Sequence, residues 1–196
     1  MKYTRLLTLS TLLAAPAAFA HPGHMAHSSI ADGMLHPLTG FDHLTMLLGL
    51  GILISRATVN NTSIKGKLSL FAAALMSLAI GLIVGSAVGA VNGVELMIAA
   101  SIFVVALGIW NAFNSRESLT KFLVTASIGL VFFHGFAHGV EATGTLSGFG
   151  VGMLISAAAI MFVGERLSHF VAGSSLANKW LSAGIAASGI ALMMAP

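Results

Sequence analysis

The stretch LSLFAAALMSLAIGLIVGSAVGA, residues 68–90, runs through 23 positions without a charged side chain. A helix that crosses the hydrocarbon core of a bilayer needs ~20 predominantly apolar residues, so this segment predicts a transmembrane helix. The whole chain has the same character, because 57% of its 196 residues are hydrophobic and only 8% are charged. A soluble domain carries roughly a quarter charged residues. Most of the surface of this protein is therefore expected to face lipid.

Five further apolar segments are separated by short polar breaks, at residues 38–55, 94–112, 119–140, 146–164 and 179–195. Each approaches the length of a membrane-spanning helix. Together with residues 68–90 they predict an all-α membrane protein with six transmembrane helices. These helices are expected to form one domain over residues 38–196.

The N-terminus has the layout of a secretory signal peptide. Lys2 and Arg5 precede an apolar run that begins at Leu6, and Ala18-Phe19-Ala20 forms an A-x-A cleavage signal. We expect residues 1–20 to be cleaved, and the alternative is an uncleaved first transmembrane helix. Cleavage would leave residues 21–37 as a His-rich periplasmic leader.

The leader carries three histidines within seven residues. His21, His24 and His27 could capture a metal ion on the outer side through neutral imidazoles. Short His-rich tracts are only a compositional indication of metal binding, so a leader without function is the alternative.

The basic residues predict the orientation of the helices. The lysines and arginines after residue 20 all lie in or beside every second polar break between the predicted helices. In a chain that crosses the membrane back and forth, these breaks are on the same side. The positive-inside rule assigns that side to the cytoplasm, which leaves the N-terminus outside. We therefore expect a multi-pass protein of the bacterial inner membrane. The basic residues form no stripe that could follow a phosphate backbone, so nucleic acid is not an expected partner. They are Arg56, Lys65, Lys67, Arg116, Lys121, Arg166 and Lys179.

One cluster of polar residues lies at the outer end of the first predicted helix. Ionisable side chains are costly in lipid and are candidates for function by default. Pro37 suits an early helical position, and His36 and His43, seven residues apart, would share one face if the helix begins early enough. Asp42 could bind a metal itself or orient His43. Met46 follows within reach of both Asp42 and His43.

A second cluster lies near the outer end of the fourth predicted helix. His134 and His138 are spaced i, i+4 and Glu141 follows three residues later, so all three line one stripe. Glu95, at the outer start of the third predicted helix, could join the site or remain a solvated end residue.

The two clusters together predict metal handling, because facing each other they would offer imidazoles and carboxylates at one depth. The chain has no cysteine, which removes thiolate ligands. Nitrogen and oxygen ligands suit nickel, cobalt or zinc. We expect the metal to be a transported substrate and expect no resident cofactor.

His36-Pro37-x-x-Gly40-x-Asp42-His43 with Met46, and His134-Gly135-x-Ala137-His138-Gly139-x-Glu141, resemble the motifs of the HupE/UreJ family. The resemblance covers essentially the whole chain. It implies a secondary permease that takes up Ni²⁺ or Co²⁺ without ATP, in the context of hydrogenase or urease maturation. The sequence has no Walker-type nucleotide loop, in keeping with that expectation.

Two other functions remain open from the residues. An intramembrane zinc-dependent hydrolase could use His134, His138 and Glu141 to activate water, although no HExxH motif is present. A metal-binding accessory protein could bind without transport. We expect a transporter and not an enzyme.

Overall fold

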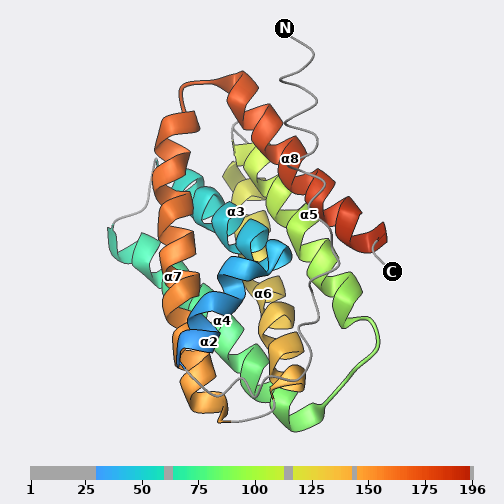
Figure 1. Cartoon of the computed structure of the whole chain (residues 1–196). Helices are drawn as coiled ribbons and strands as arrows, with labels where there is room; N and C mark the ends of the chain where they lie inside the picture. Colours follow the sequence, from blue (N-terminus) through green and yellow to red (C-terminus); the bar gives the residue numbers. More distant parts are fainter. Residues whose placement is uncertain (1–29, 60–63, 113–116, 143–144, 195–196) are drawn as a thin grey trace, which may run out of the picture.

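The computed structural model describes residues 30–59, 64–112, 117–142 and 145–194, and all the regular secondary structure in these residues is α-helical. Residues 1–29 lie outside the described part, and with them lie the predicted signal peptide and His21, His24 and His27. Figure 1 shows the described helices packed side by side around α3. In chain order they are α2 (Ile30–Thr39), α3 (Phe41–Ala57), α4 (Ile64–Val88), α5 (Val94–Ala112), α6 (Glu117–Glu141), α7 (Leu146–Val171) and α8 (Ser175–Met194).

Four of these helices, α4, α5, α6 and α7, are long and apolar enough to cross a membrane. Helices α2 and α3 meet the same criterion only as a pair, and they are bent by 82°, which is the geometry of a broken span or of a re-entrant loop. Helix α8 has 20 residues and is not among the candidates, because serine, asparagine, lysine and small residues dilute its apolar content. A multi-pass α-helical protein is confirmed, with four or five candidate spans in the described residues.

The break between α2 and α3 differs from the single helix predicted over residues 38–55. Pro37 lies in the last turn of α2 instead of the first turn of a helix, and Gly40 separates the two helices. The boundary expected between a leader at 21–37 and the helical domain thus falls inside α2. His36 and His43 do not share one helical face, because they belong to different helices.

Glycines bring α4 and α6 into backbone contact. A Cβ atom added to Gly81 would lie 2.0 Å from the carbonyl oxygen of Phe132, and one added to Gly135 would lie 2.0 Å from that of Leu78. Small residues of this kind allow helices to approach closely in lipid. Gly89 follows the end of α4 with a φ of +80°, a left-handed backbone conformation that favours glycine.

Helix α7 packs in the same way against α2 and α3. A Cβ atom on Gly33 of α2 would lie 2.0 Å from the carbonyl oxygen of Phe149, and one on Gly51 of α3 would lie 2.0 Å from that of Met161. The described residues thus contain two close helix units, α4 with α6, and α7 with α2 and α3.

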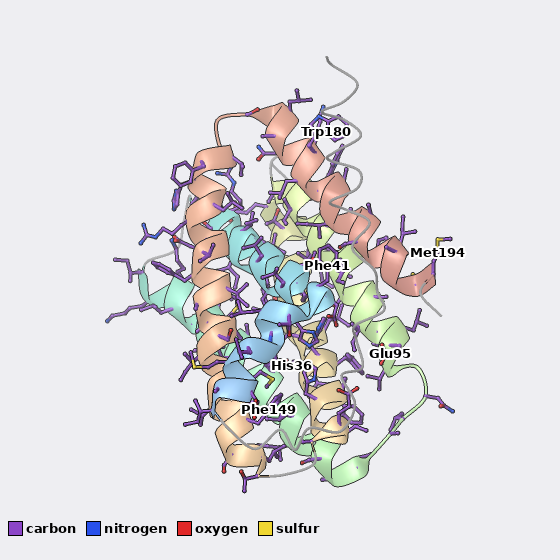
Figure 2. All side chains as sticks on the ribbon, in the orientation of Figure 1. His36, Phe41, Glu95, Phe149, Trp180 and Met194 are labelled. Atoms are coloured by element: carbon purple, nitrogen blue, oxygen red, sulfur yellow. The ribbon has the colours of Figure 1, made fainter. Side chains whose placement is uncertain are left out.

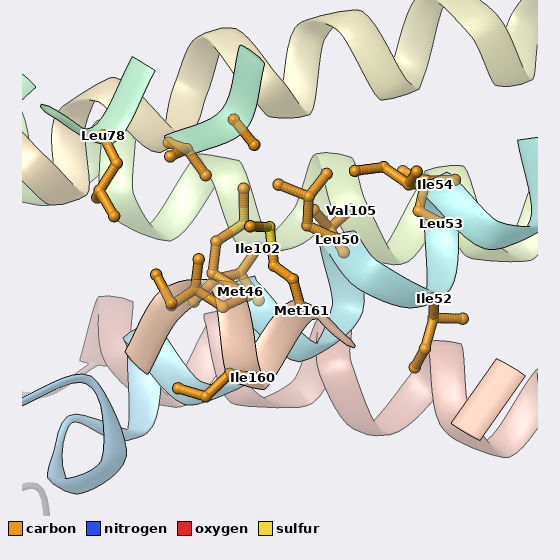
Figure 3. Close-up of a cluster of buried hydrophobic side chains, with 14 of the residues drawn as sticks. Met46, Leu50, Ile52, Leu53, Ile54, Leu78, Ile102, Val105, Ile160 and Met161 are labelled. Atoms are coloured by element: carbon orange, nitrogen blue, oxygen red, sulfur yellow. The ribbon is translucent and has the colours of Figure 1, made fainter. Parts of the chain in front are cut away.

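Helix α3 supplies much of the hydrophobic core. Its buried face meets α5 and α7, and Figure 3 shows Met46 and Leu50 beside Ile102 of α5 and Met161 of α7. This apolar layer lies directly after the break at Gly40. The polar residues around the break are therefore next to the hydrophobic core.

Candidate metal site

The backbone at Gly40 places the residues of the first cluster. The Gly40 N–H donates to the carbonyl of His36 at 3.0 Å, and the Leu44 N–H donates to the carbonyl of Gly40 at 2.9 Å. A Cβ atom on Gly40 would lie 3.0 Å from His43 Nδ1 and 3.1 Å from Asp42 Oδ1. The missing side chain therefore leaves room for the Asp42 carboxylate and the His43 ring at the bend.

Helix α6 places the second cluster by presenting two adjacent faces. Gly135 and Gly139 press against the backbone of α4. His134 and His138, each one residue earlier, project from the neighbouring face and are both buried. These two glycine contacts fix the position of α6 against α4. They thereby also fix how far the His134 and His138 imidazoles extend towards α3.

The two clusters meet, with His43 at the centre. Its ring centroid lies 5.6 Å from that of His36, 4.9 Å from that of His134 and 4.3 Å from that of His138. The rings of His36 and His138 are 4.1 Å apart. The potential ligand atoms form two overlapping groups, each within 4.8 Å, which are His36, His43 and His138, and Asp42, His43 and His134.

Polar contacts orient the His43 ring. Its Nδ1 lies 2.9 Å from Asp42 Oδ1, a close electrostatic contact that is poorly aligned for a hydrogen bond. Its Nε2 faces the Nε2 of His138 in direct contact. One imidazole edge is thus turned to a carboxylate and the other to a second imidazole.

The cluster is largely shielded from the surroundings. His43, His134 and His138 are 5%, 2% and 6% exposed, while His36 and Asp42 are partly exposed. Phe149 at the start of α7 covers one side, with its ring centroid 5.7 Å from that of His36 and 6.2 Å from that of His138. Figure 2 shows His36 and Phe149 near each other, with α2 running between α7 and the centre of the bundle.

The position of the cluster along α6 adds detail to the expected outer location. His134 is seven residues before Glu141, the last residue of α6. At ~1.5 Å per helical residue this places it ~10 Å inside that end of the helix. His134 therefore lies inside the bundle, whereas His138, three residues before Glu141, lies nearer to that end of α6.

Two carboxylates lie between the cluster and the end of the bundle. Glu141 has a carboxylate oxygen 3.8 Å from His138 Nδ1, and its side chain is 56% exposed. Glu95 is exposed and outside the cluster. Both line a pocket of about 230 Å³ formed by residues 90–95 and the last turns of α6.

Met46 is fully buried in the apolar layer after the break (Figure 3). Its side chain belongs to the hydrophobic core, and its assignment as a ligand stays a prediction.

One further polar residue contacts the cluster but lies outside both sequence motifs. The Ser101 hydroxyl of α5 lies 2.8 Å from His134 Nε2. A single serine in an apolar helix gives no sequence signal of such a contact, because serine is common in membrane helices.

The two groups together contain four imidazoles and one carboxylate, a ligand set without thiolate that suits nickel, cobalt or zinc. This set lies at the bend between α2 and α3. Fold and site together define a multi-pass helical membrane protein with a buried histidine–carboxylate cluster. The family model described as HupE / UreJ protein matches residues 9–192, and the chain belongs to this family. It is 29% identical over 159 residues to Protein HupE of Rhizobium leguminosarum bv. viciae, across 76% of this chain and 77% of that protein. No solved structure matches the chain.

Proposed function

We propose that this protein is a secondary permease that takes up a divalent transition-metal ion, Ni²⁺ or Co²⁺, across the bacterial inner membrane. The observation that carries the proposal is the convergence of His36, Asp42, His43, His134 and His138 at the break between α2 and α3. Transporters commonly bind their ions where a membrane helix is discontinuous.

The site favours reversible binding of a dication. Neutral imidazoles supply lone pairs, and the Asp42 carboxylate offsets part of the charge of the ion. The ligand atoms of the two groups come from separate helices, α2, α3 and α6. A small shift between these helices would therefore open the ligand shell and release the ion.

Membership of the HupE/UreJ family supports a role in metal uptake. The preference for nickel or cobalt over zinc rests on the resemblance, because the ligand types suit all three ions. Supply of a hydrogenase or urease with its metal is part of the same proposal.

The proposed topology has six spans and an external N-terminus after cleavage of the signal peptide. In this arrangement the pocket with Glu95 and Glu141 lies at the outer mouth, and His21, His24 and His27 precede it as capture residues. The membrane potential would drive entry, at ~2.3 kcal/mol per charge per 100 mV, or about twice that for a dication.

The decisive experiment reconstitutes the protein in liposomes and measures uptake of Ni²⁺, Co²⁺, Zn²⁺ and Mn²⁺ under a potassium diffusion potential. We expect nickel or cobalt flux that rises with an inside-negative potential and needs no ATP. Metal binding without flux would instead support an accessory protein. Hydrolysis of a supplied peptide or lipid that depends on zinc would support the enzyme.

A further inference from the structure

The Ser101 hydroxyl joins α5 to the metal cluster through two short contacts. Ser101 is completely buried. Its Oγ lies 2.6 Å from the carbonyl oxygen of Ile98 and 2.8 Å from Nε2 of His134. These two partners together determine where the protons lie.

A serine hydroxyl has one hydrogen to donate and lone pairs to accept with. The Ile98 carbonyl can only accept, so the hydroxyl hydrogen is directed to it. The Ser101 oxygen must then accept from His134, whose Nε2 carries the hydrogen. A neutral imidazole has one N–H, so Nδ1 of His134 carries an available lone pair.

The Nδ1 atom of His134 has no hydrogen-bond partner among the described residues, although it is buried. His134 belongs to the same potential ligand group as Asp42 and His43. A buried nitrogen lone pair without a partner is costly unless a ligand uses it. With Nε2 engaged by Ser101, Nδ1 is the nitrogen of His134 that keeps a lone pair for an ion in the cluster.

We infer that Ser101 is a positioning residue that holds His134 as the Nε2–H tautomer and presents its Nδ1 to the transported ion. The inference rests on the proposed function and extends it to a residue outside the two motifs. A hydrogen bond to the distal nitrogen of a ligating histidine fixes the ring and raises its basicity. Loss of such partners typically weakens metal binding by about 10–100-fold.

The first test determines the tautomer of His134 without metal. Purified protein labelled with ¹⁵N-histidine is studied by NMR in micelles, and the His134 signals are assigned by comparison with His134→Gln. The wild type is expected to show a protonated Nε2 and an unprotonated Nδ1. Ser101→Ala should give a mixture of tautomers. A wild-type ring protonated on Nδ1 would overturn the inference, whether or not the variant folds.

The second test measures Co²⁺ affinity from the visible absorption of the bound ion. We expect Ser101→Ala to bind about 10–100-fold more weakly and Ser101→Thr, which keeps the hydroxyl, to recover most of the affinity. Ser127→Ala is the matched control, because Ser127 is equally buried on α6 and has no hydrogen-bond partner among the described residues. Its affinity should equal that of the wild type.

The two tests separate this inference from the proposed function. If Co²⁺ binds the wild type and Ser101→Ala equally well, the role of Ser101 is refuted while the permease remains. If the wild type neither binds nor transports metal but keeps the Nε2–H tautomer, the proposed function fails and the hydrogen-bond assignment stands.

Discussion

His43 is the residue on which the candidate site depends most. It is the one residue shared by the two ligand groups in the described part of the chain, and it is 5% exposed. Glu141 is different, because its side chain is 56% exposed and its carboxylate lies 3.8 Å from the nearest histidine nitrogen. Solvent screening weakens interactions of exposed charges, so the two residues should contribute unequally.

We predict that His43→Ala lowers Co²⁺ affinity by at least about 100-fold and abolishes uptake, because it removes a ligand from both groups. Glu141→Gln should retain affinity within about tenfold of the wild type and mainly slow uptake. Titration calorimetry and uptake at equal expression measure both effects. His169→Ala, an exposed histidine on α7 near Glu165, is the control. Equal losses in His43→Ala and His169→Ala would contradict the assignment.

The sequence was sufficient to find the residues of the cluster, because histidines and carboxylates stand out in an apolar chain. The sequence alone could not show whether the two clusters meet; in the structure, potential ligand atoms of His36, Asp42, His43, His134 and His138 lie close together. Their role in metal binding stays a prediction. Ser101 could not be found in this way, because its importance depends on which helix α5 faces.

At the level of the helices, glycines have two separate structural roles. Gly135 lets the backbone of α6 touch that of α4, whereas Gly40 makes room for the side chains at the break. Substitution at these positions should consequently affect different properties.

We predict that Gly135→Ala destabilises the protein by about 1–3 kcal/mol, because the new methyl group would meet the Leu78 carbonyl oxygen at 2.0 Å and force the helices apart. Thermal unfolding in detergent measures this change. Gly129→Ala on the same helix is the matched control, because its added methyl group would have no neighbour within 4 Å. A Gly135→Ala protein as stable as Gly129→Ala would refute the close contact of α4 and α6.

Gly40→Ala should instead act on the site. Its methyl group would lie 3.0 Å from His43 Nδ1 and 3.1 Å from Asp42 Oδ1, and both side chains can shift by rotation. We expect the unfolding temperature to stay within a few degrees of the wild type while Co²⁺ affinity falls by about tenfold, in the range of altered ligand support. An unchanged affinity would show that the orientation of the Asp42–His43 pair does not matter for binding.

The extents of the helices were predictable because apolar runs and polar breaks mark them, and most observed ends lie within four residues of the expected ones. The break was not predicted, because proline is favoured in the first turn of a helix, whereas Pro37 lies in the last turn of α2. Helix α2 was missed for the same reason. Its ten residues include Asp32, Gly33 and Pro37, which resemble a polar leader when the packing against α7 is unknown.

At the scale of the whole molecule, an ion pair connects the two close helix units at a distance from the cluster. Lys67 of α4 lies 2.8 Å from the Glu165 carboxylate of α7. Glu165 is 16 residues beyond Phe149, or ~24 Å along the helix. Its side chain is 7% exposed and also contacts Arg166 and His169 at 3.3 Å. The cluster and this ion pair therefore hold the same two units together at two separate levels.

We predict that Lys67→Met destabilises the protein by about 1–3 kcal/mol, because it removes a partner from a buried carboxylate. Lys67→Met combined with Glu165→Gln should recover part of this loss, since the second change removes the charge. Unfolding of the two single variants and the double variant in detergent gives the interaction energy. Additive losses would show that the pair does not couple α4 to α7. Lys121→Met, which breaks an exposed pair with Glu117 within α6, is the control.

The pairing of helices could not be read from the sequence. Glycines spaced four residues apart, such as Gly81 and Gly85, indicate that close contacts exist. They do not identify the partner helix, because any small-residue face can meet another. The burial of Glu165 depends on that pairing, so it could not be predicted from the sequence either.

The break at Gly40 also has a consequence for local stability. The first three amides of α3 are those of residues 41–43. They lie between the N–H groups of Gly40 and Leu44, which donate to carbonyls four residues earlier. The first N–H groups of a helix have no partner within it, and Gly40 offers no side-chain cap. The Phe41 and Asp42 amides should therefore exchange with deuterium faster than the amides in the interiors of α2 and α3, whereas the His43 amide is bonded to the Asp42 carboxylate. A bound ion would immobilise Asp42 and His43 and slow that exchange. The exchange rate of the amides at the break would therefore report whether the site holds an ion.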